Sequence, residues 1–294
     1  MNHPMHDHDW LAERFEANRA HLRGVAFRML GSLPEADDAV QETWLRLSRS
    51  EAADIENLGG WLTTVVGRVC LDMLRSRDAR REDSIEAADP VAMANAPHDP
   101  EQDALLADSV GLALLVVLDV LEPAERLAFV LHDMFAVPFD EIARIVGRSP
   151  AAVRQLASRA RRRVRGAPAY SSAEIDRQRA VVEAFLGALR NGDYDGLIAV
   201  LDPDVVVRAD TGPEHAMMES RGAENWAKGA VRFGRALRFA EPALVDGAVG
   251  LVLAPKGKLL RALKFKIVND RVAEVAVITS GERLRGLSIG ALLP

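Results

Sequence analysis

The chain has 294 residues and only one cysteine. Cys70 has no second cysteine to pair with, so the sequence excludes a disulfide framework and a cysteine-based zinc site. The best candidate for a membrane-spanning segment, Leu112 to Val120, is far too short to cross a bilayer. The first residues also lack the basic start and apolar core of a secretory signal. We therefore expect a cytoplasmic protein that binds no metal and no cofactor.

Lysine is scarce, and positive charge is unevenly placed along the chain. The formal net charge is -6, and lysine is absent before Lys228, so the preceding residues use arginine alone. From Arg154 to Arg165, however, the chain carries several arginines and no acidic residue. A local reversal of charge on an acidic chain favours a phosphate-bearing partner.

The residues before these arginines predict how they are presented. Pro138 and the acidic pair after Phe139 fit the first turn of a helix, since proline and acidic residues are favoured there. Gly147 fits the end of that helix, Ser149 the N-cap of the next one and Pro150 its first position. Two helices joined by a short turn, the second one basic, predict a helix-turn-helix. The alternative is an ordinary helical hairpin with a solvated arginine face.

Helical periodicity and its interruptions divide the chain into modules. We predict a first all-helical module at 1–81, with three helices, and a flexible acidic linker at 82–103, where prolines are scattered among acidic residues. A second helical module at 104–166 contains the helix-turn-helix.

A third module, at 173–294, changes character. It opens with an amphipathic helix over 173–190, and later segments around Val205 and over 259–268 alternate as strands do. A helix is expected around 223–237, and hairpin turns are expected at Lys256-Gly257 and Asn269-Asp270.

Several segments together resemble a known family. The segment from Pro34 to Trp44 resembles the polymerase-binding helix of extracytoplasmic-function sigma factors, and Gly60 to Arg75 resembles their promoter-melting helix. The helix-turn-helix resembles their second promoter-reading domain. The third module resembles the SnoaL-like, cone-shaped α+β fold that extends the SigJ-type subgroup, although the glycine-rich run of many members is replaced here by the residues at 209–215.

The resemblance implies a fold class of two all-α sigma domains followed by an α+β SnoaL-like domain. It also implies that the protein is a sigma factor whose partners are the RNA polymerase core and promoter DNA. The expected polymerase-binding residues are Asp37, Asp38, Gln41 and Glu42. Without the resemblance, an acidic solvated helix face would be the simpler interpretation.

The expected DNA-binding residues fall in two groups. On the recognition helix, Arg154, Gln155 and Ser158 are candidate base readers, because arginine suits guanine and glutamine suits adenine. The other expected DNA contacts are Asn57, Arg75, Arg77, Arg80, Arg148, Ser149, Arg159, Arg162 and Arg163. Trp61 is either a platform for an unstacked promoter base or, more simply, a core residue.

The resemblance implies that the third module regulates the sigma domains in cis, and the fold suggests that it holds a small-molecule ligand. A candidate pocket would be lined by Asp210, His215, Trp226 and Phe233. Two alternatives remain: a ligand-responsive helix-turn-helix regulator, and a fused polyketide-cyclase or isomerase that uses Asp210 and His215 as an acid/base pair. A loop aspartate and histidine without further constellation are usually solvated, so we expect the protein not to be an enzyme.

Overall fold

The computed structural model describes residues 4–50, 55–83, 111–210, 217–230, 240–254 and 259–292. Contacts divide the chain into two compact units, one formed by Met1–Ala88 with Val120–Arg161 and the other by Asp89–Asp119 with Arg162–Pro294. The predicted linker at 82–103 lies almost entirely outside the described residues.

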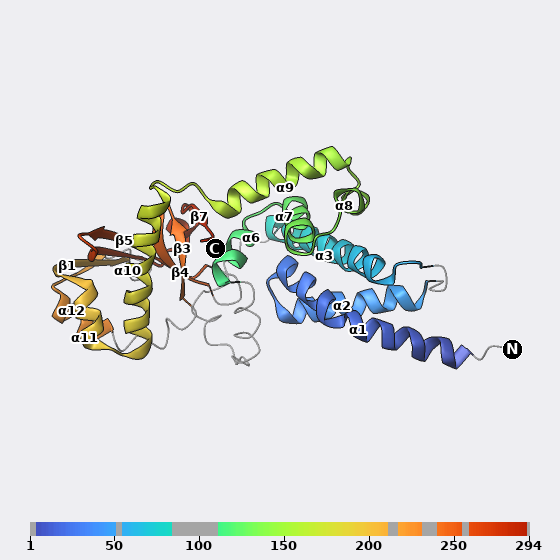
Figure 1. Ribbon diagram of the computed structural model, residues 1–294, viewed down its shortest axis with the longest axis horizontal. Helices are drawn as coiled ribbons and strands as arrows, with labels where there is room; N and C mark the ends of the chain where they lie inside the picture. The colour runs from blue at the N-terminus through green and yellow to red at the C-terminus, as the bar shows by residue number, and fades with distance from the viewer. Residues whose placement is uncertain are drawn as a thin grey trace. The chain divides into compact units, whose positions relative to one another are not determined.

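The first unit begins with three helices that pack on one another, α1 (Pro4–Leu30), α2 (Leu33–Ser48) and α3 (Leu58–Asp83) (Figure 1). Their apolar stripes meet in a core that includes Leu22, Met29 and Leu62, each fully buried. The three helices predicted for the N-terminal segment are therefore present.

The remainder of this unit continues with α7 (Pro123–Phe129), a π-helical turn η2 (Val130–Met134), α8 (Phe139–Val146) and most of α9 (Pro150–Arg165). Helix α3 packs against α7 and α8. The packing is tight at Gly67 of α3, where an added Cβ would lie 3.2 Å from Leu131 Cδ1 of η2 and 3.5 Å from Leu127 Cδ1 of α7. The N-terminal helices and the helix-turn-helix therefore share one core.

The second unit contains a seven-stranded sheet with the order β2-β1-β6-β5-β4-β3-β7. Strands β1 and β6 are parallel, and the other neighbours are antiparallel. The strands are β1 (Leu201–Asp210), β2 (Met217–Arg221), β3 (Ala240–Val245), β4 (Ala248–Leu253), β5 (Arg261–Val268), β6 (Arg271–Ile278) and β7 (Ile289–Gly290).

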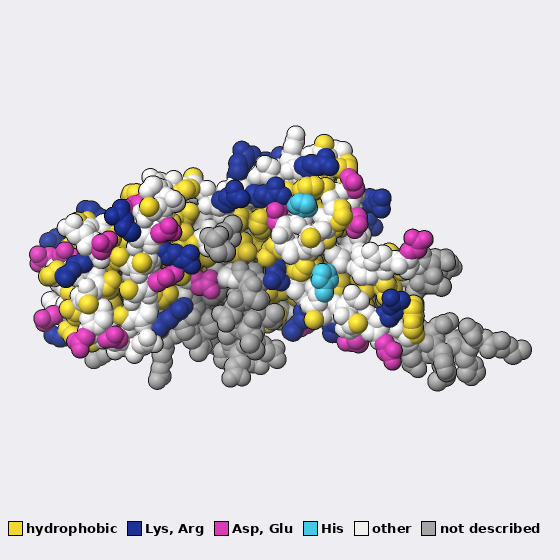
Figure 2. Space-filling model, in the orientation of Figure 1, with side chains coloured by type: hydrophobic (Ala, Val, Ile, Leu, Met, Phe, Trp, Pro, Cys, Tyr) yellow, Lys and Arg dark blue, Asp and Glu magenta, His cyan; other side chains and the backbone are white. Residues whose placement is uncertain are grey.

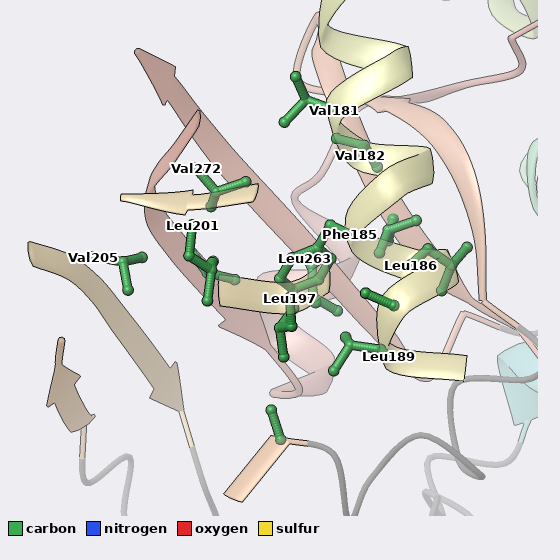
Figure 3. Close-up of a cluster of buried hydrophobic side chains, with 14 of the residues drawn as sticks. Val181, Val182, Phe185, Leu186, Leu189, Leu197, Leu201, Val205, Leu263 and Val272 are labelled. Atoms are coloured by element: carbon green, nitrogen blue, oxygen red, sulfur yellow. The ribbon is translucent and has the colours of Figure 1, made fainter. Parts of the chain in front are cut away.

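One face of the sheet packs against helices α10 (Ser172–Asn191), α11 (Tyr194–Val200) and α12 (Ala223–Ala230). Figure 3 shows side chains of α10, among them Phe185 and Leu189, beside Leu197 of α11 and Leu263 of β5. Removing these apolar side chains from water stabilises the module. A long helix, short helices and a sheet confirm the predicted α+β class of the third module.

The alternation predicted for 259–268 is confirmed in β5. Leu263 belongs to this core, whereas Lys264 pairs with Asp246 and Lys266 pairs with Glu274. The predicted turn that follows is also present, since Asn269 and Asp270 both adopt positive φ, as a two-residue hairpin turn requires.

Other elements predicted for the third module lie partly or wholly outside the described residues. The helix predicted around 223–237 is present as α12, which ends at Ala230, and 231–239 lie outside the described residues. The hairpin turn predicted at Lys256-Gly257 also lies outside the described residues.

The opposite face of the sheet carries a smaller core that includes helix α6 (Leu112–Asp119) and α13 (Gly281–Arg285). Helix α6 packs on β3 and β7, and its Ala113 joins Val252 and Ile278 in this cluster. Residues 113–118 are all buried. Helix α6 therefore belongs to the sheet unit, although the chain continues from it directly into the helix-turn-helix segment.

The end of α9 is also fixed to the sheet. The Ala291 N–H donates to the Val164 carbonyl at 2.7 Å, which satisfies an oxygen in the last turn of the helix. Beside this bond, Gly166 has φ +63°, and the two backbones are so close that a Cβ on Gly290 would lie 2.8 Å from the Gly166 Cα. Only glycine fits at Gly290 without a shift of backbone.

The single cysteine lies in the core of the first unit. Cys70 is fully buried in α3, and burial raises the pKa of its thiol to about 12, against an opposing effect of the Arg126 charge. A thiol held in its neutral form is a poor nucleophile and a poor metal ligand. Within the described ranges, no helix is long and apolar enough to cross a membrane.

Candidate nucleic-acid interface

The predicted helix-turn-helix is confirmed by the local backbone. Gly147 ends α8 in the left-handed conformation, with φ 70°, and its N–H donates to the Ala143 carbonyl. Ser149 then caps α9, because its hydroxyl accepts a hydrogen bond from the Ala152 N–H at 3.2 Å. Each predicted signal of the turn therefore has the physical role expected of it.

Helix α9 has one buried and one exposed side. Val153, Leu156 and Ala160 are buried, whereas the three candidate base readers, Arg154, Gln155 and Ser158, are exposed. The candidate phosphate contacts Arg148, Ser149, Arg159, Arg162 and Arg163 are exposed as well. Figure 2 shows basic side chains gathered along this helix. The structure thus places all the predicted recognition-helix residues, and the turn before them, at the surface.

Two arginines of α9 are held by carboxylates of the same unit. Arg159 Nε donates to Glu125 at 2.7 Å, and the Glu125 side chain is only 4% exposed. Arg161 Nε donates to Asp133, also at 2.7 Å. A buried carboxylate needs such a partner, because an unpaired buried charge is costly. Arg159 therefore ties α9 to α7, a role that the sequence analysis missed because the partners lie far apart in the sequence.

The side chain of Arg154 lies against an aromatic ring, whereas those of Arg159 and Arg161 pair with carboxylates. Its guanidinium carbon lies 5.6 Å from the centre of the Phe139 ring, within the range of a cation–π interaction. The Phe139 ring in turn stacks on His132, with ring centres 3.7 Å apart. Neither aromatic residue was predicted to belong to the interface.

The residues predicted on and before α3 have mixed environments. Asn57 caps α3, since its Oδ1 accepts a hydrogen bond from the Gly60 N–H at 3.0 Å. Arg77 donates to Glu35 at 2.5 Å and to the Leu30 carbonyl at 3.4 Å, so it joins α3 to the turn between α1 and α2. Arg75 is exposed, whereas the side chain of Arg80 lies outside the described residues. Trp61 is half-buried.

The predicted polymerase-binding residues lie on one helix, α2, whose opposite side carries buried Ala36, Val40 and Leu47. Two of the four make ion pairs: Asp37 with Arg23 at 2.7 Å and Glu42 with Arg46 at 2.9 Å. Asp38 and Gln41 are exposed. The face is therefore polar and accessible, with two of its carboxylates already oriented by arginines.

The structure describes two of the four residues predicted to line a ligand pocket in the third module, Asp210 and Trp226. Asp210 is buried, and its carboxylate accepts hydrogen bonds from the Thr279 backbone N–H and hydroxyl and from Arg283 at 2.9 Å. Burial raises the pKa of Asp210, but the Thr279 hydrogen bonds and the Arg283 charge outweigh it, so the pKa lies below its ordinary value. This carboxylate anchors α13 to the sheet.

Trp226 packs in a different place, stacked on Phe185 with ring centres 5.5 Å apart. His215 and Phe233 lie outside the described residues. An open groove of about 480 Å³ lies instead between α10 and α11, and it is lined mainly by small apolar residues such as Ala180, Ala184 and Ala199. Of the predicted pocket residues that the structure describes, neither Asp210 nor Trp226 lines it.

Two family patterns match the helical parts of the chain. Sigma-70 region 2 matches residues 14–80, which include α2 and most of α3. Sigma-70 region 4 matches residues 111–164, which run from α6 to nearly the end of α9. The polar face of α2 and the basic face of α9 therefore lie in two sigma-factor regions that occur in their expected order.

Individual relatives extend this similarity. The ECF RNA polymerase sigma factor SigJ of Mycobacterium tuberculosis is 41% identical over 250 residues, covering 82% of this chain and 80% of SigJ. The probable ECF RNA polymerase sigma factor SigI of the same species is 41% identical over 208 residues, covering 70% of this chain and 72% of SigI. A crystal structure of SigJ aligns with 94% of this chain and 98% of its own, at 32% identity and a TM-score of 0.45.

The similarity to SigJ covers a larger share of the chain than precedes the sheet, so it reaches into the module that contains the sheet. Both sigma regions are matched in order, and both relatives are covered over more than two thirds of their length. The chain therefore belongs to the extracytoplasmic-function (ECF) RNA polymerase sigma factors.

Proposed function

We propose that this sigma factor docks on the RNA polymerase core through the exposed face of α2 and reads promoter DNA with α9 and the basic part of α3. The observation that carries the proposal is the exposed face of α9, which presents arginine, glutamine and serine and no acid. Such a face suits both base edges and phosphates, and a helix of this kind enters the major groove.

The roles on α9 follow from position. Arg154, Gln155 and Ser158 lie toward the N-terminal half of the helix, which approaches base edges in helix-turn-helix proteins, so we assign them to base reading. Arg162 and Arg163 follow in the last turn and are assigned to the DNA backbone. Phosphate contacts fix the register without reading sequence.

The first test is transcription in vitro. The purified full chain, added to core polymerase on a library of promoter fragments, should yield transcripts from a defined subset of fragments. Absence of transcripts from every fragment, with folded protein that binds core polymerase, would contradict the proposal. A ligand-responsive DNA-binding regulator would bind fragments but would not start transcription with core polymerase alone.

The phosphate assignment has its own measurement. Arg162→Ala should reduce the slope of log affinity against log salt by about one unit, because one counterion-releasing contact is lost. The matched control is Arg179→Ala on α10, an exposed arginine paired with Glu183. An unchanged slope for Arg162→Ala removes that arginine from the phosphate contacts.

The polymerase face is tested by reversing one charge. Asp38→Arg should weaken assembly with core polymerase, because an acidic face suits a basic partner surface, while leaving the fold intact because Asp38 is exposed. Glu183→Arg, on an exposed face of α10, is the control. Equal assembly of both variants with core polymerase would contradict the docking role of α2.

We further propose that the SnoaL-like module regulates the sigma domains in cis and performs no catalysis. Two contacts support this role: α6, which is matched as part of region 4, packs on the sheet, and the end of α9 is bonded to Ala291. The engagement of Asp210 with Arg283 argues against its use as an acid/base residue.

A single substitution tests cis regulation while leaving the module in place. Gly290→Ala should disturb the contact with Gly166 and change transcription from a chosen promoter in either direction. Gly187→Ala on α10 is the control, because an added Cβ there meets nothing within 4 Å. Unchanged transcription by folded Gly290→Ala would argue against regulation through this contact.

A further inference from the structure

The support of Arg154 differs in kind from that of its neighbours on α9. Arg159 and Arg161 are held by carboxylates that accept hydrogen bonds from their guanidinium groups. Arg154 instead lies over the Phe139 ring. A carboxylate occupies N–H donors at the edge of a guanidinium, whereas an aromatic ring contacts its face.

This difference matters for reading a base. Arginine recognises guanine with two N–H groups, which donate to O6 and N7 in the major groove. A support that used those donors would compete with the base. A ring beneath the guanidinium restricts the side chain and leaves its donors free, so less conformational freedom is lost when the base is bound.

The ring that supports Arg154 is itself fixed. Phe139 begins α8, and it stacks on His132 of η2 at an interplanar angle of 26°. The His132 ring is oriented by a contact of 3.0 Å between its Nδ1 and the Val137 carbonyl, in which the nitrogen donates. The η2 turn, the segment after it and the first residue of α8 therefore all contribute to the position of one arginine.

We propose that Phe139 is a specificity-determining positioning residue, which holds the Arg154 guanidinium face-on so that its edge is presented to a guanine of the promoter. The proposal rests on the base-reading role proposed above for Arg154. It adds that sequence discrimination depends on an aromatic ring that does not itself touch DNA.

The experiment uses the holoenzyme formed from full-length chain and core polymerase, on templates randomised across the upstream promoter element. Arg154→Ala first identifies the base pair at which preference is lost. Phe139→Leu keeps apolar bulk and removes the ring face, so it should reduce the preference at that same base pair by about two- to fivefold, the range of an exposed cation–π contact. Phe139→Tyr keeps the ring and should retain the preference.

Two controls separate positioning from folding. The salt dependence of binding and the preference at other base pairs should be unchanged in Phe139→Leu, whereas a damaged helix-turn-helix would lose affinity at every position. In the double variant, Phe139→Leu should add nothing to Arg154→Ala, because the ring acts only through the arginine.

The outcomes distinguish the two proposals. Transcription with no base preference lost in Arg154→Ala would overturn the base-reading role and the Phe139 proposal with it. A preference lost in Arg154→Ala but kept in Phe139→Leu would overturn the Phe139 proposal alone. A uniform loss across all positions in Phe139→Leu would likewise assign the ring to folding and overturn its positioning role.

Discussion

Single residues of this sigma factor show that an arginine of α9 can serve the fold, since Arg159 pairs with a buried carboxylate. Glu125 is nearly inaccessible and is bonded to Arg159, so removing its charge should weaken the attachment of α9. Glu125→Gln should lower the free energy of unfolding by about 1–3 kcal/mol, the range for hydrogen bonds that involve a buried charged group. Urea denaturation measures the change.

The matched control for Glu125→Gln is Glu183→Gln on α10. Glu183 also pairs with an arginine, but both side chains of that pair are largely exposed, at 43% for Arg179 and 50% for Glu183. Its loss should cost less than about 1 kcal/mol. Equal effects of the two substitutions would show that burial of Glu125 adds nothing to its ion pair.

The buried carboxylate of Asp210 predicts a pH dependence. The folded protein lowers its pKa below the ordinary value of 3.8, so it stabilises the fold above that pH, and the stabilisation is lost as the pH falls through the folded pKa. The stability difference between wild type and Asp210→Asn should therefore be full above about pH 4 and shrink below it. Thermal unfolding between pH 7 and pH 2.5 tests this, and a difference that grows on acidification would contradict it.

At the scale of elements, the turn between α8 and α9 depends on the left-handed backbone conformation of Gly147. Gly147 has φ 70°, and an added Cβ would meet nothing within 4 Å. Gly147→Ala should thus cost about 1–2 kcal/mol, the penalty of a left-handed alanine. Gly147→Asn should cost less, because asparagine tolerates this conformation. Equal losses in urea denaturation would point to a steric cause instead.

The same elements show which structural features can be predicted from the sequence. The helix-turn-helix was predictable because its signals are local: Gly147, Ser149 and Pro150 each act on a neighbouring peptide group. The alternation of β5 and the turn at Asn269 were predictable for the same reason. The stack of Phe139 on His132 was not, since an aromatic residue in a first helical turn has no sequence pattern that names its partner.

Contacts between residues far apart in the sequence could not be predicted either. Asp210 was expected to line a pocket, and the sequence offered no sign of Thr279 and Arg283, about seventy residues later, which bind its carboxylate. Helix α6 was expected to belong with the helix-turn-helix. Because nearly every residue of α6 is apolar, the sequence does not show which face of the helix is buried or against which element. In the structure the helix packs on β3 and β7.

At the scale of the whole molecule, α6 makes removal of the sheet a disruptive change. A chain ending before α10 would lose the surface on which Ala113 and its neighbours pack, and would also lose Ala291, the donor to the end of α9. We expect such a chain to bind a hydrophobic dye and to unfold at lower temperature than the full chain. A truncated chain with unchanged melting and no dye binding would show that α6 is stable without the sheet.

The position of α6 also bears on how such proteins can be recombined. Residues 111–164 are inherited as one sigma region, yet their first helix is fitted to strands more than a hundred residues further along the chain. A hybrid that joins the helix-turn-helix of one relative to the sheet module of another must therefore transplant α6 with that module, as two separate pieces of gene. Drift on the β3 and β7 surface likewise has to be matched by compensating changes in α6, so substitutions in these distant segments should be correlated among descendants.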